Sequence, residues 1–336
     1  MKKIAVPFAF LCLIFLFVLL FFHHIFYSPL GKKKVEKIIY IPSGASFNEV
    51  LKLLEKENIV EYPYKLVLCA KILKKTKSIK AGEYRVNSLW SAKELLDHLC
   101  KGRVLTHKVK IPEGLTWWQV GRIIEKSGLT TFEEFKKCVF DPFLLKSLGV
   151  PQNTAEGFLF PDTYFFLKED KEKTARKIVS TMIQEFWKKT DKYLWHGKRP
   201  DPKRLLKIVI LASLVEKETS IESERPIIAG VFLNRLKRGM LLQCDPTVIY
   251  GIGPKFNGNL TKKDLKDKSN LYNTYVYKGL PPTPICSPSL ASLKAVLHPA
   301  KHNYLYFVAK GDGTHIFSKT LKQHNLAVKR YILKQN

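Results

Sequence analysis

The stretch IPSGASFNEVLKLLEKENIV, residues 41–60, returns as IPEGLTWWQVGRIIEKSGLT, residues 111–130. In each copy an Ile-Pro pair and a glycine precede a hydroxyl residue, and Glu or Gln follows that residue three positions later. Ser46 with Glu49, and Thr116 with Gln119, therefore have the spacing of a capping box at a helix N-terminus. Apolar residues then recur at helical spacing. Each copy predicts a strand that ends at Ile-Pro, a glycine turn and a helix with one buried face.

The residues between the two copies complete a small folding module. GEYRV, residues 82–86, predicts a strand, and Ser91 with Glu94 predicts the capped start of another helix. We therefore expect an α+β module with an internal repeat over residues 36–135. Its order of strand, glycine turn, hydroxyl cap and apolar helix resembles that of LysM modules, which bind the glycan chains of peptidoglycan. Two similar scaffold halves without a ligand are the alternative interpretation.

The N-terminus carries a long apolar run. Residues 4–22 contain no charged side chain, and about 20 such residues cross a hydrocarbon layer as a helix. A cleavable signal peptide has a shorter apolar region of about 7 to 15 residues and a small-residue cleavage site. We therefore predict a cytoplasmic tail and an uncleaved transmembrane anchor in residues 1–28. Lysines stand on both sides of the run and leave its orientation open, because long domains cross largely regardless of charge.

The whole chain is strongly basic. Its 336 residues include 57 Lys and Arg against 29 Asp and Glu, a formal net charge of +28. With 46% hydrophobic residues it is not a disordered polycation, and the charge predicts an anionic partner: nucleic acid, anionic lipid or an acidic polymer. The six cysteines form no CxxC pair, so we expect no metal site and interpret them as small buried apolar residues.

Residues 150–336 predict a second α+β domain, and its most informative stretch is DPKRLLKIVILASLVEKETS, residues 201–220. Asp201 suits an N-cap and Pro202 the first helical position. The helix that follows is apolar almost all round, so we expect it to be buried and to present Glu216 at its end. Burial and the negative helix terminus oppose ionisation, and a neutral carboxyl is what a general acid needs. The alternative is that Glu216 begins a solvated turn.

Two further clusters combine aromatic rings with carboxylates and amides. They are AEGFLFPDTYFF, residues 155–166, and LLQCDPTVIYG, residues 241–251. A sugar offers C–H faces that stack on rings and hydroxyls that need paired donors and acceptors, so both clusters suit a glycan. Ordinary core packing and an Asp-Pro turn are the alternatives.

Together with EGFLFPDTY, four later motifs resemble the endolytic murein transglycosylases, the MltG or YceG-like family. These are LASLVEKET, VFLNRLKRGMLLQCDPTVIYG, YNTYVYKGLPPTPICSP and HPAKHNYLYFVAKGDGTHIF. The resemblance runs from about residue 41 to residue 325, in the family's order. It implies that Glu216, the first Glu of VEKET, is catalytic. It also implies one anchor in the cytoplasmic membrane, a LysM-like subdomain and a catalytic body on the extracytoplasmic side. Cys244 and Cys286 depart from the residues that the family usually has there.

The expected function is therefore a lyase that cuts within glycan strands. Glu216 would protonate the glycosidic oxygen between N-acetylmuramic acid and N-acetylglucosamine, then take a proton from the muramyl C6 hydroxyl, leaving a 1,6-anhydro end. No cofactor is expected. The candidates for holding the strand are Glu156, Glu218, Gln243, Asp245, Tyr272 and Asn273. Membrane lipid is an expected partner, and a peptidoglycan synthase is one by family analogy, where the enzyme would terminate nascent strands. A non-catalytic wall-binding scaffold is the alternative, whereas nucleic-acid binding lacks a recognisable module.

Overall fold

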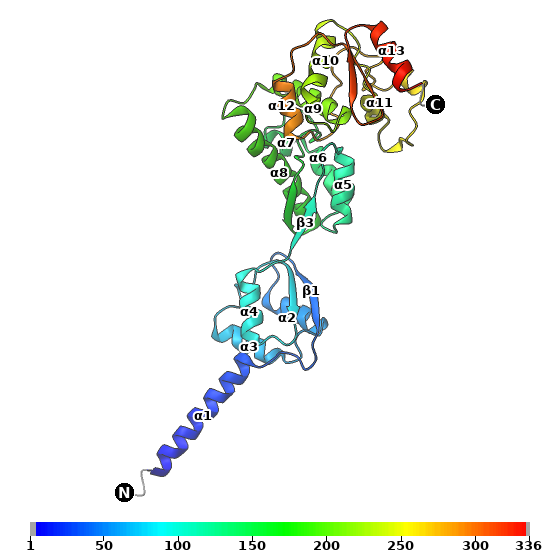
Figure 1. Ribbon diagram of the computed structural model, residues 1–336. Helices are drawn as coiled ribbons and strands as arrows, with labels where there is room; N and C mark the ends of the chain where they lie inside the picture. Colours follow the sequence, from blue (N-terminus) through cyan, green and yellow to red (C-terminus); the bar gives the residue numbers. More distant parts are fainter. Residues whose placement is uncertain (1–4, 334–336) are drawn as a thin grey trace. The chain divides into compact units, whose positions relative to one another are not determined.

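The computed structural model describes residues 5–333 and has a mixed α+β architecture (Figure 1). The chain divides into two compact units. Unit 1 contains the residues up to His107 together with Phe165–Thr174. Unit 2 contains Lys108–Tyr164 and the residues from Ala175 onward. The chain therefore passes between the units more than once.

Unit 1 begins with α1 (Ala5–Tyr27), the helix expected from the apolar run. Among the described residues it is the one helix long and apolar enough to cross a membrane, with a mean hydropathy of 2.4 over Phe10–Tyr27 and side chains that are almost all exposed. The remaining predicted tail, residues 1–4, lies outside the described part of the chain. An α1 that buries so little apolar surface in the protein is compatible with a membrane anchor.

The rest of unit 1 follows the sequence pattern closely. β1 (Glu36–Ile41) pairs antiparallel with β2 (Gly82–Asn87), and α2 (Phe47–Lys56), α3 (Pro63–Ile72) and α4 (Ala92–Lys101) pack around them. The capping boxes predicted at Ser46 and Ser91 are both present, which confirms these two helix starts. The returning segment 165–174 is tied to unit 1 by an ion pair of 3.3 Å between Lys168 and Glu83.

Unit 2 is mainly helical. Its first helices are α5 (Trp117–Lys126), α6 (Phe132–Val139), α7 (Pro142–Ser147) and α8 (Lys171–Thr190), and α8 belongs to unit 2 from Ala175 onward. A π-helical turn (Asp191–Trp195) precedes α9 (Pro202–Glu218), α10 (Arg225–Lys237) and α11 (Asp245–Ile252). Short 3-10 turns at Gly253–Lys255 and Asp264–Lys266 are followed by α12 (Leu290–Leu297) and α13 (Leu321–Tyr331). A hairpin of β5 (Tyr306–Ala309) and β6 (His315–Ser318) lies before α13. β3 (Thr106–Lys110) pairs with β4 (Thr163–Leu167), and in each of these strands the chain passes from one unit to the other.

The buried helix α9 forms the centre of unit 2. Asp201 caps it by accepting a hydrogen bond from the Arg204 N–H at 3.1 Å, and Pro202 occupies the first turn, as the sequence predicts. Val209, Ala212 and Val215 are fully buried, and α9 packs against α10, α11 and α12. Because other helices pack on several sides of α9, its apolar side chains are buried. The Glu216 side chain in its last turn is likewise surrounded by protein groups.

The boundary between the units differs from the expected module of residues 36–135. The division falls inside β3, so the second copy of the repeat belongs to unit 2. The physical reason is packing. The first copy buries its helix face in the core of unit 1, whereas α5 packs on α6, and the turn before α5 pairs its backbone with Ser287. Residues 108–135 therefore share a unit with Glu216. The last residues of the expected catalytic domain, 334–336, lie outside the described part.

Four of the six cysteines are buried and none of the described cysteines forms a disulfide. Cys69, Cys138, Cys244 and Cys286 have the buried positions expected of small apolar residues, whereas Cys12 is exposed on α1 and Cys100 is half-buried. Burial raises the pKa of the Cys244 and Cys286 thiols well above the ordinary value. These thiols are therefore neutral packing groups.

Candidate active site

The carboxyl group of Glu216 lies where three helices of unit 2 meet. Its side chain, near the end of α9, is only 6% exposed. Oε2 accepts hydrogen bonds from the backbone N–H of Ser289 at 2.9 Å and from its hydroxyl at 2.5 Å. Ser289 is also the N-cap of α12. Oε1 lies 3.5 Å from a guanidinium nitrogen of Arg225, the first residue of α10. The expectation of a buried helix that delivers a carboxylate is confirmed in geometry.

The glycine turn of the second repeat copy packs directly on this carboxylate. Gly114 has a φ of +71°, and a Cβ there would lie 3.5 Å from Cγ of Glu216. Its N–H donates to the Ser287 carbonyl at 2.9 Å, and its own carbonyl accepts from Lys217 Nζ at 3.2 Å. The turn predicted from the repeat is therefore part of the wall beside Glu216.

Glu113, which comes directly before Gly114 in the turn, was not predicted as a site residue. Partial desolvation and the negative charge of Glu216 raise the pKa of the Glu113 carboxyl, which places the two carboxylates within electrostatic reach. The signal that could have found it is the difference between the repeat copies, because the first copy has Ser43 at the matching position.

Glu156 is fully buried and holds the neighbouring elements together. Its Oε2 accepts from the Trp117 N–H at 3.1 Å, Oε1 accepts from the Gly157 N–H at 3.3 Å, and the carboxyl also hydrogen-bonds the Tyr250 hydroxyl. Burial raises the pKa of Glu156 to about 8 despite these donors. Its carboxyl faces protein groups on every one of these contacts, so it ties the start of α5 to α11 instead of facing solvent.

Close packing explains why a glycine follows Glu156 in the motif EGFLFPDTY, residues 156–164. Gly157 has a φ of +83°, and a Cβ there would lie 2.6 Å from the Pro284 ring and 2.8 Å from Val209 of α9. Any larger residue would therefore push α9 away from the loop before α12, and the spacing around Glu216 depends on this glycine.

A row of aromatic rings lies beside Glu156. The ring centroid of Tyr250 is 4.9 Å from that of Trp118 and 4.8 Å from that of Tyr272. The Tyr272 hydroxyl shares a hydrogen bond of 2.8 Å with Thr283, and burial raises the pKa of Tyr272. All three rings are only partly buried, so they combine a packed edge with an accessible one. Such a row suits the apolar face of a sugar.

Three other predicted residues come together in a separate cavity of about 420 Å³. Glu218, Gln243 and Asp245 line it, whereas Glu216 is not among its lining residues. Burial raises the pKa of Glu218 to about 7, and the charge of Asp245 adds to the shift. The Tyr275 hydroxyl donates to Asp245 at 2.5 Å, and a guanidinium N–H of Arg235 donates to Oε1 of Gln243 at 2.9 Å. Three of the predicted residues are thus in a cavity that Glu216 does not line, although Glu218 is on the same helix as Glu216.

The side chain of Asn273 is used inside its own loop. It is fully buried, its amide N–H groups donate to the carbonyls of Asp264 and Asp267, and its oxygen accepts from the Tyr275 N–H at 3.0 Å. With both amide hydrogens engaged, Asn273 shapes the loop that carries Tyr272 and Tyr275. This placement differs from the direct substrate contact expected for Asn273.

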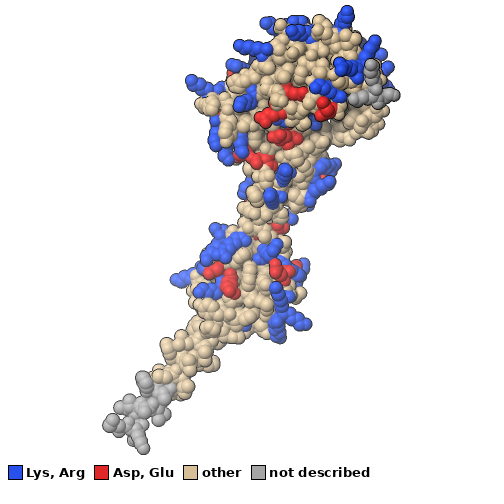
Figure 2. Space-filling model, viewed as in Figure 1, with Lys and Arg blue, Asp and Glu red and all other residues tan. Residues whose placement is uncertain are grey.

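The charge of the molecule is not distributed evenly. Figure 2 shows Asp and Glu side chains gathered on one face of unit 2, with Lys and Arg around them. Glu216 and Glu222 both lie within electrostatic reach of Glu113, since partial desolvation and then these two charges raise the pKa of the Glu113 carboxyl. The candidate active site therefore has other carboxylates near Glu216, although the chain as a whole is strongly basic.

Comparisons with known proteins identify the family of the chain. Residues 39–330 match the model of the YceG-like family. The endolytic murein transglycosylase of Bacillus subtilis (strain 168) is 34% identical over 319 residues, which cover 89% of this chain and 85% of the relative. That of Streptococcus pneumoniae (strain R6) is 31% identical over 327 residues, covering 87% of this chain but 58% of the longer relative. The crystal structure of a yceG-like protein from Listeria monocytogenes has a TM-score of 0.57 and 30% identity, and covers 88% of this chain and 99% of its own. The chain belongs to the YceG-like family.

Proposed function

We propose that this protein is a membrane-anchored endolytic murein transglycosylase in which Glu216 is the catalytic acid and base. One observation carries the proposal: the Glu216 carboxylate is held at the junction of α9, α10 and α12, in a chain whose curated relatives are named endolytic murein transglycosylases. The row of rings at Trp118, Tyr250 and Tyr272 supplies a surface that suits a sugar.

The contacts of Glu216 assign different tasks to its two oxygens. Oε2 is fixed by the N–H and the hydroxyl of Ser289, whereas Oε1 has only the 3.5 Å contact with Arg225. A backbone N–H can only donate, so a proton on the carboxyl is best placed on Oε1. Oε1 is therefore the atom that exchanges a proton with the substrate, while Ser289 holds the group in one orientation.

The proposed reaction uses this one carboxyl twice. Protonated Glu216 gives its proton to the glycosidic oxygen as the bond between C1 of N-acetylmuramic acid and that oxygen breaks. The carboxylate then accepts the proton of the muramyl C6 hydroxyl, whose oxygen bonds to C1 of the same sugar. The products are a free 4-hydroxyl on N-acetylglucosamine and a 1,6-anhydromuramyl end. No water is consumed, so the reaction is that of a lyase.

Substitution of Glu216 tests the proposal. We expect Glu216→Gln to lower turnover of purified glycan strands by about 10²- to 10⁴-fold, because the variant has no proton to transfer. Mass spectrometry of the digests should show 1,6-anhydro ends with the native protein. Glu222→Gln is the matched control, since it removes a nearby exposed carboxylate and should keep most of the activity. Reducing ends in the digest would mean hydrolysis, and activity that survives in Glu216→Gln would remove the assignment.

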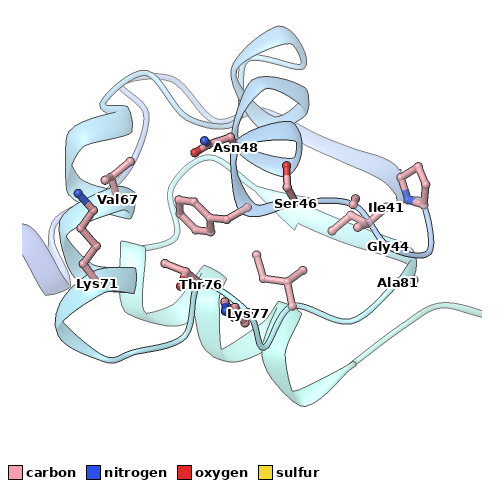
Figure 3. Close-up of a pocket in the computed structure, with 13 residues that line it drawn as sticks. Ile41, Gly44, Ser46, Asn48, Val67, Lys71, Thr76, Lys77 and Ala81 are labelled. Carbon is pink, nitrogen blue, oxygen red and sulfur yellow. The ribbon is translucent and has the colours of Figure 1, made fainter.

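The LysM-like resemblance of unit 1 motivates a second part of the proposal, glycan binding apart from catalysis. A pocket of about 750 Å³ opens at the glycine turn of the first repeat copy (Figure 3). Its lining combines half-buried apolar side chains, the polar groups of Ser46, Asn48 and Thr76, and the cations Lys71 and Lys77. Apolar faces suit sugar rings, and the lysines suit the carboxylates of peptide-substituted strands.

A binding measurement on a protein that does not cut the glycan tests this pocket separately from catalysis. In the Glu216→Gln background, we expect Lys77→Glu to weaken binding to purified peptidoglycan several-fold, measured by sedimentation, because it reverses a cation of the pocket lining. Lys56→Glu, an exposed lysine on α2 that does not line the pocket, should bind as before. Equal binding by both variants would remove the pocket from the proposal and leave the catalytic part intact.

We further propose a single-pass arrangement in the cytoplasmic membrane, with both units on the extracytoplasmic side, where murein lies. The length and hydropathy of α1 support the anchor. An anchored enzyme reaches strands close to the membrane, which fits an action on nascent strands and a partner among the peptidoglycan synthases.

A further inference from the structure

The anchor helix enters unit 1 without a linker. Phe22 on α1 is 41% exposed, whereas Ile25 on the same helix and Leu30 just after it are both 0% exposed in the core of unit 1. Three residues of helix span about 4.5 Å. The headgroup layer on each side of a bilayer is roughly 5 to 7 Å deep. If α1 crosses the membrane, the surface of unit 1 around it therefore lies at the depth of the lipid headgroups.

That surface carries a set of aromatic and cationic side chains, the juxtamembrane collar, which consists of Tyr27, Lys32, Tyr62, Tyr64 and Lys93. Lys93 on α4 donates to the Tyr27 hydroxyl at 3.2 Å and lies over its ring. Lys32 lies over the Tyr62 ring, which is 6.3 Å from that of Tyr64. The collar thus joins the end of α1 to the first turns of α3 and α4.

The collar is fastened to the end of α1 by buried contacts. Nζ of Lys65, a buried residue, donates to the Ser28 hydroxyl at 2.7 Å and to the Pro29 carbonyl at 3.2 Å, and it lies over the Tyr62 ring. The backbone N–H of Glu61 donates to the Leu30 carbonyl at 2.9 Å. These contacts leave unit 1 no free joint at the membrane, so its orientation relative to α1 is set by the fold.

The carboxylates around the collar have other partners: Asp97, whose charge acts on Lys93, pairs with Lys75 at 2.5 Å. Glu94 closes the capping box of α4 with Ser91, and Glu61 accepts the backbone N–H of Lys32 at 3.0 Å. The outward ring edges remain accessible, since Tyr27 and Tyr64 are each more than half exposed. Tyrosine is enriched at the membrane interface, and lysines near an anionic surface are attracted to it.

We propose that the juxtamembrane collar is a docking surface for anionic phospholipid headgroups, which seats unit 1 on the bilayer. The inference rests on the membrane anchoring of the proposed function. Tyrosine rings at the headgroup depth and the collar lysines beside them give the surface both an apolar and an electrostatic attraction to such lipids. Seating fixes the height of unit 1 and its pocket above the membrane.

Hydrogen exchange on the full-length protein in lipid nanodiscs tests this proposal. We expect the first turns of α3 and α4 to exchange more slowly in nanodiscs that contain phosphatidylglycerol than in nanodiscs of phosphatidylcholine alone. A lysine near an anionic surface favours docking by roughly fivefold, so Lys93→Glu should remove most of the extra protection. Lys101→Glu, at the other end of α4, makes the same charge change away from the collar and should keep it.

The outcomes separate the collar from the anchor. Flotation with vesicles of either lipid reports anchoring by α1 alone, and glycan digestion reports catalysis. A protein that floats with both lipids but shows the same exchange in both contradicts headgroup docking while the anchor stands. Equal loss of protection in Lys93→Glu and Lys101→Glu would reduce the effect to overall charge and would also overturn the collar. A protein that fails to float overturns the anchor and the collar together.

Discussion

The two oxygens of Glu216 are held unequally, and Ser289 is the residue that makes the difference. Its hydroxyl lies 2.5 Å from Oε2. In Ser289→Ala the backbone N–H remains but the hydroxyl is lost, so the carboxyl gains rotational freedom. We expect kcat to fall about tenfold, the equivalent of roughly 1.4 kcal/mol, with little change in KM, because the residue acts through Glu216. Steady-state kinetics on soluble glycan strands measure both.

Loss of a helix cap is the effect that this substitution must be separated from. Ser289 also caps α12, and such a loss costs about 1 kcal/mol of stability by itself. Thr320→Ala removes the equivalent cap from α13. If Thr320→Ala lowers kcat as much as Ser289→Ala does, the effect comes from general destabilisation and Ser289 has no positioning role.

Glu156 predicts a pH dependence of stability. Burial raises its pKa to about 8 in the folded protein, whereas its ordinary value is 4.5. Between these values the folded state holds a proton that the unfolded state releases, so the native protein loses stability as pH rises, by at most about 1.4 kcal/mol per pH unit. Glu156→Gln does not titrate. We therefore expect the variant to gain stability relative to the native protein as pH rises from 5 towards 8, measured by denaturant unfolding.

The change of stability with pH, compared between the two proteins, is the relevant quantity, because the substitution also alters the hydrogen bonds that the Glu156 carboxyl accepts from Trp117 and Gly157. That alteration shifts the whole curve of the variant but not its slope. Glu185→Gln, on α8, serves as a control for removing a carboxylate elsewhere in unit 2. Parallel pH curves for the native protein and Glu156→Gln would contradict a neutral buried carboxyl.

The sequence predicts the positions of some site residues and not of others. The position of Glu216 at the end of a buried helix was predictable because an apolar helix that ends in an acid is a local pattern, whereas its catalytic role rests on the family resemblance. Its partner Ser289 was not predictable, because it lies 73 residues further along the chain and looks like an ordinary helix cap. Asn273 was expected to contact substrate, yet amide groups in polar loops serve backbone carbonyls as readily, and only coordinates distinguish the two uses.

Among the elements, the paired helix starts of the repeat offer a matched test. Ser46→Ala and Thr116→Ala remove the same capping hydrogen bond from α2 and from α5. Each should cost about 1 kcal/mol in its own unit, seen as faster hydrogen exchange of that helix. We expect only Thr116→Ala to lower turnover, because the turn before α5 packs on Glu216 and the α5 start binds Glu156. Equal turnover in the two variants would contradict a role for the second copy in the site.

Elements were predicted best where the signal is local. The three capping boxes at Ser46, Ser91 and Thr116 and the strand at residues 82–86 follow from short patterns, and all are present. The pairing of β3 with β4 could not be predicted, because it joins segments more than 50 residues apart that carry no complementary pattern. The assignment of the second repeat copy to unit 2 depends on that kind of long-range contact.

Over the whole molecule, the net charge and the local distribution of charge are different properties. The chain carries a net charge of +28, yet Asp and Glu side chains gather on one face of unit 2 (Figure 2), and Glu113 lies within electrostatic reach of Glu216. In the function proposed above, the lysines attract the protein to peptide-substituted murein and lipid headgroups, while the chemistry belongs to Glu216, which has other carboxylates near it. Composition predicts the first property but not the second, since it contains no information on where the charges lie.

The return of residues 165–174 to unit 1 has a consequence for the order in which the protein matures. A ribosome adds roughly 5 to 20 residues per second. Unit 1 therefore stays unfinished for several seconds after His107 is made, and Glu83 gains its ion pair with Lys168 only after residues 108–164, the first segment of unit 2, have been made. Synthesis of unit 2 therefore begins before unit 1 is complete. A chain stalled between residues 107 and 165 would expose an incomplete unit 1.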